Sequence, residues 1–159
     1  MFEQTGVPTK DMVMEKFPSV ERIDQGPAAV IECYRSIPCN PCETACKSRA
    51  ITVGEDINNI PRIDYGECTG CKVCISKCPG LAIMVVDGSK SKETLEFSLP
   101  YEFLPLPRKG EYVDALDRSG QFLAKVKVVN VLNPSAFDRT PVVTVESPRE
   151  YLYELRNIK

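Results

Sequence analysis

Residues 68–80 read CTGCKVCISKCPG, and this stretch carries the pattern that decides the fold. Its four cysteines are separated by two, two and three residues, and Pro79 follows the last of them. An offset of 32 residues places six earlier residues on identical ones: Cys39 on Cys71, Cys42 on Cys74, Cys46 on Cys78, Ala50 on Ala82, Ile51 on Ile83 and Val53 on Val85. Residues 30–86 therefore contain an internal repeat.

The repeat predicts two similar halves. Each half reads as a cysteine-rich loop, a short helical turn and a brief strand, the strands lying at residues 50–53 and 82–86. Residues 54–59 (GEDINN) predict a turn between the halves, and residues 61–65 (PRIDY) predict a strand that leads into the second loop.

The cysteine spacing indicates iron–sulfur chemistry. Three thiolates at intervals of two residues can surround one face of a [4Fe–4S] cluster, and the fourth cysteine, followed by proline, then ligates the neighbouring cluster. Because one loop alone cannot complete either cluster, two such loops are needed. The chain has eight cysteines and no histidine, which excludes imidazole triads, histidine-containing zinc sites and Rieske ligation.

The first loop departs from this pattern. The position equivalent to Cys68 is Ser36, a cysteine stands instead at Cys33, and Lys47 replaces the expected proline. Either the first cluster lacks one cysteine ligand, or Cys33 reaches around a loop lengthened by three residues to supply it. We favour the second interpretation, because eight thiolates then serve two clusters with none left over.

The expected ligand sets cross between the loops. One cluster takes Cys33, Cys39, Cys42 and Cys78, and the other takes Cys46, Cys68, Cys71 and Cys74. Backbone N–H groups must point at the sulfurs to offset their charge, and Gly66, Gly70 and Gly80 permit that close approach. Two zinc sites with four thiolates each, or clusters with a purely structural role, are the alternatives.

Composition limits the class of protein. The chain has 159 residues, of which 43% are apolar, and 20 basic residues face 22 acidic ones with no segment in basic excess, so no nucleic-acid partner is expected. The longest apolar run, residues 81–86, is too short to span a membrane, and no signal peptide precedes the cysteines. Clustered cysteines in such a chain predict a reducing, cytoplasmic location.

Four segments are expected along the chain. Residues 1–29 are an arm with one short helix over residues 9–17 under a Thr9 cap, and residues 30–86 form the cysteine-bearing domain. Residues 87–107 are expected to be a linker and extended segment, and residues 108–159 a small β unit.

The β unit is predicted to end in a helix. Its strands are expected at residues 111–116, 121–132 and 141–146, with a turn at 117–120. The closing sequence SPREYLYELRNI has Ser147 as a cap, Pro148 at the first helical position and Glu150 completing a capping box. This unit is expected to serve in docking.

Residues 30–86 resemble the bacterial two-[4Fe–4S] ferredoxin family, through CTGCKVCISKCPGLAI and its partner CYRSIPCNPCETACKSRAI. The resemblance implies an α+β chain built on a ferredoxin-like (βαβ)2 two-cluster module and one-electron transfer at low potential. The longer string GPAAVIECYRSIPCNPCETAC also resembles the iron–sulfur subunits of multi-subunit, flavin-dependent amino-acid dehydrogenases of the proline and hydroxyproline type. That resemblance implies a flavoprotein partner carrying FAD or FMN.

Three functions follow as hypotheses. The first is an electron-transfer subunit of a hetero-oligomeric oxidoreductase, since no nucleotide-binding fingerprint or acid–base constellation occurs in this chain. The second is a soluble carrier ferredoxin with appended domains. The third is a non-redox, metal-stabilised interaction module. In each of these, no residue of this chain is expected to be catalytic.

Overall fold

The two strands that flank the cysteine loops pair with each other at the centre of the fold. The computed structural model describes residues 2–159, and in it β1 (Ala28–Ile31) pairs antiparallel with β4 (Ile83–Asp87). Every residue of both strands is buried. Their near-continuous apolar sequence is typical of strands that are covered on both faces.

Alternate residues of these strands belong to two separate cores. Val30, Met84 and Val86 face the core shared with the N-terminal helices and the later strands. Ile31 and Ile83 face a second core, which contains the cysteine-bearing helices. Because side chains alternate along a strand, β1 and β4 contribute to both cores, one on each face.

The predicted repeat is present in the order of elements between β1 and β4. α4 (Pro41–Ala45), β2 (Ile51–Thr52), β3 (Arg62–Ile63) and α5 (Val73–Lys77) follow in turn, and β2 pairs antiparallel with β3. The short strands expected in each half, and the strand expected within residues 61–65, are therefore confirmed. Arg49 and Leu81, one repeat apart, both adopt left-handed backbone conformations, with φ of 57° and 52°.

The N-terminal arm contains more helix than the sequence predicts. The helix under Thr9 is confirmed as α2 (Lys10–Met14), with the Thr9 hydroxyl accepting from the Met12 N–H at 3.4 Å. The expectation that the rest of the arm is irregular is wrong, because α1 (Phe2–Thr5) and α3 (Val20–Gln25) flank it. Both α2 and α3 bury apolar side chains in the first core, which orders the arm.

The expected linker at residues 87–107 is also wrong in part. Its middle forms β5 (Thr94–Pro100), which pairs with β4 on one side and with β8 (Val142–Pro148) on the other. Leu95, Phe97 and Leu99 alternate along it and are buried. These residues show the period-2 pattern of a strand, which the prolines that follow had obscured.

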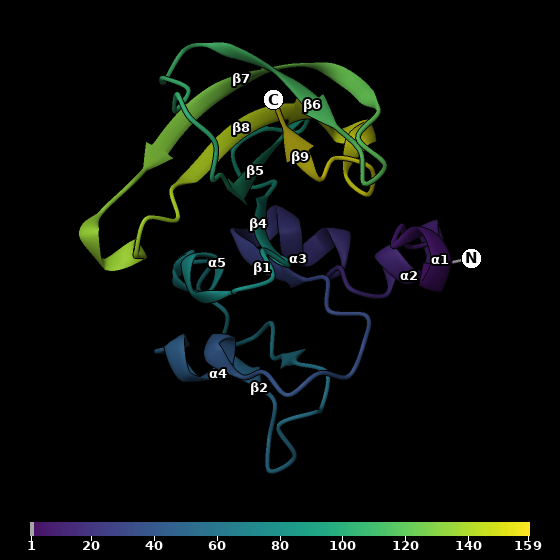
Figure 1. Ribbon diagram of the computed structural model, residues 1–159. Coiled ribbons are helices and arrows are strands. Elements are labelled where there is room, and N and C mark those ends of the chain that lie inside the picture. The colour runs from purple at the N-terminus through teal and green to yellow at the C-terminus, as the bar shows by residue number, and fades with distance from the viewer. Residues whose placement is uncertain (1) are drawn as a thin grey trace.

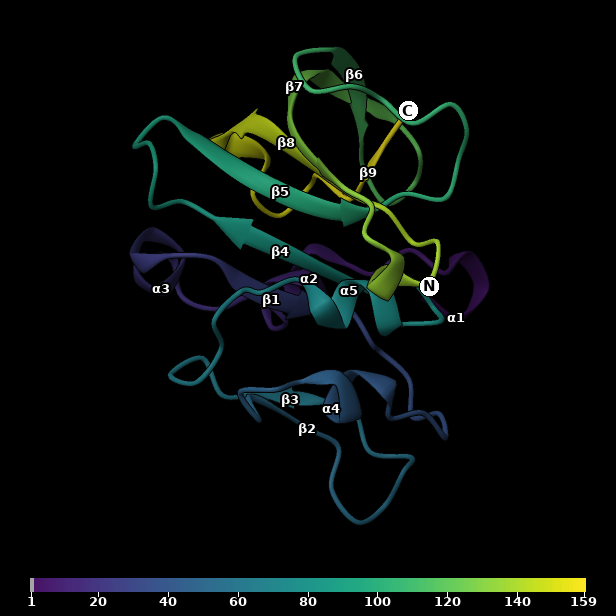
Figure 2. The same ribbon diagram turned by 90° about the vertical axis from the view of Figure 1, so that its left-hand side faces the viewer.

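The C-terminal strands join the same sheet. The predicted hairpin is confirmed as β6 (Tyr112–Leu116) and β7 (Phe122–Leu132), and the third strand as β8. The seven-stranded sheet runs in the order β1-β4-β5-β8-β7-β6-β9, so residues 108–159 do not form a separate sheet. Figures 1 and 2 show the strands from β5 onward curving over β1 and β4, with α4, β2 and β3 on the opposite side.

The predicted C-terminal helix is wrong. Ser147 lies within β8 opposite Leu95, and only a 3-10 turn, η2 (Arg149–Tyr151), follows. The chain then ends in β9 (Asn157–Ile158), which pairs with the open edge of β6. Pairing with β6 satisfies the backbone groups of an exposed edge, which outweighs the local capping sequence.

None of the helices formed by residues 2–159 has the length and apolar character that crossing a bilayer requires.

Candidate metal centre

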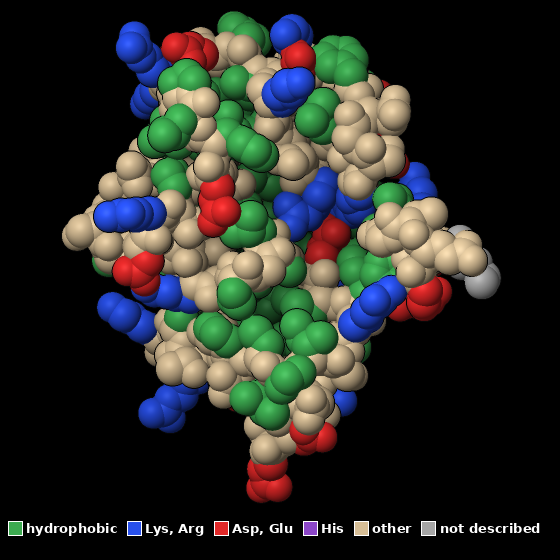
Figure 3. Space-filling model, in the orientation of Figure 1, with side chains coloured by type: hydrophobic (Ala, Val, Ile, Leu, Met, Phe, Trp, Pro, Cys, Tyr) green, Lys and Arg blue, Asp and Glu red, His purple; other side chains and the backbone are tan. Residues whose placement is uncertain are grey.

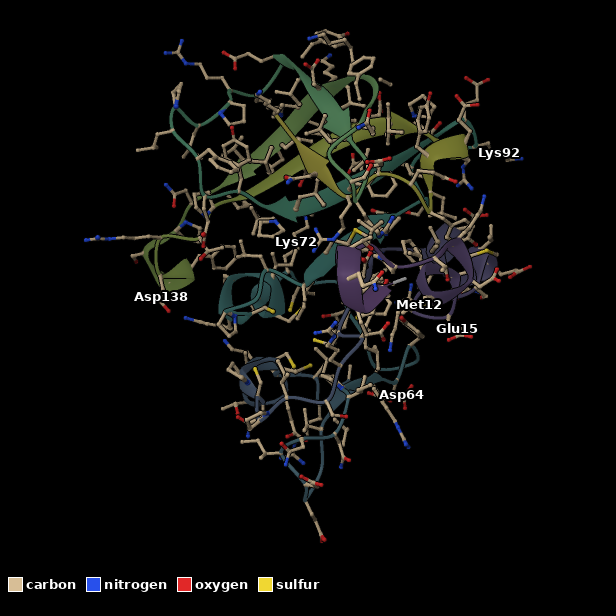
Figure 4. All side chains as sticks on the ribbon, turned by 45° about the vertical axis from the view of Figure 1, so that its right-hand side comes forward. Met12, Glu15, Asp64, Lys72, Lys92 and Asp138 are labelled. Atoms are coloured by element: carbon tan, nitrogen blue, oxygen red, sulfur yellow. The ribbon has the colours of Figure 1, made fainter. Side chains whose placement is uncertain are left out.

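The two helices of the repeat hold equivalent cysteines. α4 and α5 pack against each other, and each carries one buried cysteine, Cys42 or Cys74. Each helix then ends at its next cysteine, Cys46 or Cys78, with nearly the same backbone angles, φ of −78° and −79°. Figure 4 shows sulfur atoms gathered around these two short helices.

Two small enclosed cavities lie beside the helices. One is lined by Cys33, Cys39, Cys42 and Cys78. The other is lined by Cys46, Cys68, Cys71 and Cys74. Their volumes are similar, about 20 Å³ each. Each cavity thus collects the four cysteines expected for one cluster, with the last cysteine of each loop crossing to the other loop's cavity.

Ser36 lies apart from both sets of cysteines. It is exposed and lines a different, polar cavity together with Thr52 and Arg62. Cys33, by contrast, lies in the wall of the first cavity beside Cys39 and Cys78. The lengthened first loop therefore places a thiol, and not a hydroxyl, in the wall of this cavity.

Hydrogen-bond donors lie close to three of the cysteine sulfurs and favour their thiolate form. The Ala29 N–H donates to Cys68 Sγ at 3.5 Å, and the Ala82 N–H donates to Cys78 Sγ at 3.3 Å. Burial raises the pKa of Cys46, but hydrogen bonds from the Ser48 hydroxyl and nearby backbone N–H groups outweigh it and leave that pKa below its usual value. Such donors stabilise the negative charge of metal-bound sulfur.

Burial and mutual repulsion raise the pKa values of the more deeply buried cysteines. Burial raises the pKa of Cys42 to about 11, despite a hydrogen bond from the Glu43 N–H, and Cys33 and its neighbours add repulsion. Burial, followed by the charges of Cys71 and the other second-site cysteines, raises the pKa of Cys74 to about 12. Four converging thiolates therefore need a cationic centre between them, and a four-iron core supplies one.

The donor set fits a cluster of several metal ions. All eight cysteines are free thiols. Across residues 2–159, no three Cys, Asp or Glu side chains converge closely enough to hold a single ion. A [4Fe–4S] core takes four thiolates, and each of the two cavities is lined by four cysteines.

Gly70 permits the close packing of the second loop against the segment that precedes β1. It has φ of +63°, and a Cβ at this position would lie 2.5 Å from Pro27 Cβ and 2.7 Å from Pro27 O. A Cβ at Gly80 would meet no atom within 4 Å, so that glycine allows no comparable approach. Only glycine at position 70 lets the loop lie against the entry to β1.

Sequence reasoning missed a cationic side chain at the second loop. Arg22, on α3, donates from Nη2 to Cys68 O at 2.8 Å and from Nε to Tyr65 O at 2.9 Å. Its guanidinium also binds Gly26 O and Pro27 O, at 2.9 and 3.2 Å. No local pattern marks this arginine, because the residues it contacts lie up to 46 positions away.

A second missed group lies beside the first loop. Glu32, which precedes Cys33, is buried and accepts from Arg118, in the turn after β6, through Nε at 2.9 Å and through Nη2. Arg156 Nε lies 3.7 Å from Glu32 Oε2, and the Tyr34 hydroxyl donates to the same oxygen at 3.2 Å. In the sequence, the one indication of this buried ion pair is that an acidic residue, Glu32, directly follows the apolar run AAVI.

Each site reaches the surface at some of its cysteines. An open groove of about 800 Å³ exposes Cys33, Cys39 and Cys78 beside Phe103, which is itself exposed. Figure 3 shows a hollow on this face in which charged side chains adjoin hydrophobic ones. At the second site Cys71 is exposed.

η1 supports α5 from the outside. η1 (Ser135–Phe137) links β7 to β8, and Lys77 of α5 donates to Ala136 O at 3.0 Å and forms an ion pair with Asp138. Figure 4 labels Asp138 beside α5. The connection between β7 and β8 thus contacts α5.

Comparisons with known proteins agree with this geometry. The family described as the 4Fe-4S dicluster domain matches residues 35–82. Pyruvate synthase subunit PorD of Methanocaldococcus jannaschii is 34% identical over 61 residues, which cover 38% of this chain and 69% of that protein. No solved structure matches the chain. Together with the eight free cysteines, these matches show that the chain belongs to the 4Fe–4S ferredoxin-like family.

Proposed function

We propose that this chain is the electron-transfer subunit of a multi-subunit oxidoreductase and relays single electrons through two [4Fe–4S] clusters. The observation that carries the proposal is the pair of adjacent cavities, each lined by four cysteines drawn from both loops. When bound, the clusters supply one-electron redox chemistry. The chain supplies their thiolates, their N–H donors and the walls that exclude water.

The ligand sets form part of the proposal. One cluster is held by Cys33, Cys39, Cys42 and Cys78, and the other by Cys46, Cys68, Cys71 and Cys74. The order β1-α4-β2-β3-α5-β4, with β1 paired to β4 and β2 to β3, supports a (βαβ)2 module over residues 30–86. The groove at the first site and exposed Cys71 at the second support an entry and an exit for electrons.

The subunit role rests on what surrounds the module. PorD is named as a subunit of pyruvate synthase, and its likeness to this chain supports work within a larger complex. We infer a flavoprotein partner from the resemblance of residues 26–46 to the iron–sulfur subunits of flavin-dependent amino-acid dehydrogenases. The eight free thiols support a reducing, cytoplasmic setting.

Anaerobic purification from the source organism tests the two parts of this proposal separately. Iron and sulfide analysis is expected to give about eight of each per chain. The native particle is expected to be much heavier than the 17.7 kDa chain and to contain a flavin. An iron-loaded monomer would make the chain a carrier ferredoxin, and a chain with zinc in place of iron and sulfide would overturn the electron-transfer role.

A further inference from the structure

Two arginines outside the cysteine repeat donate to backbone carbonyls at the two ends of the second cysteine loop. Arg22, from the N-terminal arm, donates to the carbonyl of Cys68 at 2.8 Å. Arg156, from the C-terminal end, donates from Nη2 to the carbonyl of Leu81, three residues after Cys78, at 2.5 Å. Each flank of the repeat therefore places one guanidinium near a cysteine of a different cavity, because Cys68 lines the second cavity and Cys78 lines the first.

The charge of Arg22 is not neutralised by a neighbour. Its hydrogen-bond partners are four backbone carbonyls, and within residues 2–159 no ion pair joins it to a carboxylate. One of those carbonyls belongs to a cysteine of the second site. A full positive charge is thus fixed beside Cys68, one of the four cysteines of that site.

The charge of Arg156 is only partly neutralised. Glu32 is nearest to Arg118, which binds both of its carboxylate oxygens, and Arg156 lies further away at 3.7 Å. These three side chains carry a net charge of about +1 at neutral pH. The Arg156 side chain is 18% exposed and lines the same groove as Cys78.

A fixed cation of this kind favours the reduced form of a nearby cluster. Reduction adds one negative charge to a cluster that already carries a net negative charge, and an adjacent cation stabilises that added charge more strongly in a partly buried setting than in water. Charge and hydrogen bonding around the sulfurs are the terms by which a protein adjusts cluster potential.

We infer that Arg22 and Arg156 are positioning residues that raise the reduction potentials of the two clusters independently. Arg22 acts on the cluster of Cys46, Cys68, Cys71 and Cys74, and Arg156 acts on the cluster of Cys33, Cys39, Cys42 and Cys78. The flanking segments thereby set the potentials of a relay whose ligands all lie within the repeat. This inference rests on the proposed electron-transfer function.

The test is a potentiometric titration, followed by electron paramagnetic resonance, of the full chain reconstituted anaerobically with iron and sulfide. Arg22→Gln is expected to lower one midpoint potential, and Arg156→Gln is expected to lower the other. Arg22→Lys and Arg156→Lys keep the charge and are expected to restore most of each shift. Arg108→Gln removes the same charge from an exposed position and is expected to move neither midpoint.

The double variant Arg22→Gln/Arg156→Gln shows whether the two arginines act on different clusters or on the same one, even if the two wild-type midpoint potentials coincide. Action on different clusters lowers both midpoints once, whereas action on one cluster lowers a single midpoint twice and overturns the inference. Fully loaded variants with unmoved midpoints also overturn it. Lys variants whose midpoint potentials shift as far as those of the Gln variants overturn it too.

A variant that binds only one of the two clusters also tests the inference. If the two single variants lose different midpoints, they support independent positioning, and if both lose the same midpoint, they overturn it. Wild-type protein that takes up no iron and sulfide would instead be a failure of the proposed function, and iron analysis detects that result separately.

Discussion

Arg118 and Glu32 form a two-pronged ion pair across 86 positions of sequence, with side chains only 9% and 5% exposed. Arg118→Ala leaves the Glu32 carboxylate buried with a weaker set of partners, and we expect it to cost about 3 kcal/mol of stability. Denaturation of the cluster-loaded chain under anaerobic conditions measures this loss. Lys10→Ala breaks the exposed pair with Glu154 and is the matched control, expected to cost less than about 1 kcal/mol. Equal costs for the two variants would contradict the structural role of the buried pair.

Cys33→Ala is expected to lose or convert one cluster, whereas Ser36→Ala is expected to keep both. Cys33 lines the first cavity with three other cysteines, and Ser36 faces a different cavity. Iron and sulfide content, together with the resonance spectra of the reduced proteins, measures the result. Two intact clusters in Cys33→Ala would overturn the ligand assignment.

Gly70→Ala is expected to destabilise the protein and to disturb the second site. An alanine there has an unfavourable positive φ, which costs about 1–2 kcal/mol, and its Cβ also overlaps Pro27. Gly120→Ala, at φ +84° with nothing within 4 Å, carries the backbone cost alone and serves as the control. Thermal denaturation and iron content measure both effects, and equal behaviour of the two variants would show that the contact with Pro27 is unimportant.

Ile23→Ala tests whether the arm belongs to the folded core. Ile23, on α3, is fully buried in the core that contains Phe97 and Leu95, so its truncation is expected to cost about 2–5 kcal/mol. Met14→Ala, at a side chain 43% exposed, is expected to change stability much less. An unchanged denaturation midpoint for Ile23→Ala would mean that the arm is dispensable.

Iron uptake is expected to strengthen as pH rises through neutrality. Burial raises the pKa of Cys42 to about 11 and that of Cys74 to about 12, so both thiols are protonated at neutral pH in the iron-free chain. Cluster assembly must release those protons, and acid therefore opposes it. Competition with an iron chelator at pH 6.5 and 8.5, corrected for the chelator's own titration, measures the effect. An iron affinity that does not change with pH would contradict this account of the thiols.

The repeat and the strands of the sheet could be predicted because their signals are local. The cysteine spacing recurs in register, and the hairpin of β6 and β7 shows alternating apolar residues around a polar turn. Thr9 was recognisable as a helix cap because its hydroxyl acts on a residue only three positions later.

The errors arose where long-range pairing overrides local sequence. Ser147, Pro148 and Glu150 read as a helix start, yet Ser147 pairs with Leu95 in the sheet. The prediction of a linker at β5 is wrong because prolines follow its alternating apolar residues, and because the strands that pair with it lie before and after it in the chain.

The arginines beside the cysteine loops could not be predicted for a related reason. Arg22, Arg118 and Arg156 each hydrogen-bond to a residue 43 or more positions away, and no local spacing records such contacts. Their importance becomes visible only when the folded chain brings the two flanks against the repeat.

The position of β1 and β4, between the cysteines and the later strands, has a consequence for how the protein is made. During translation the cysteine loops leave the ribosome before β5, Arg118 and Arg156 have been synthesised. The loops therefore emerge without the elements that later cover and anchor them. The growing chain therefore exposes eight reactive thiols for as long as the second half is being translated. Iron–sulfur insertion is accordingly expected to follow release of the finished polypeptide, with the thiols kept reduced until then.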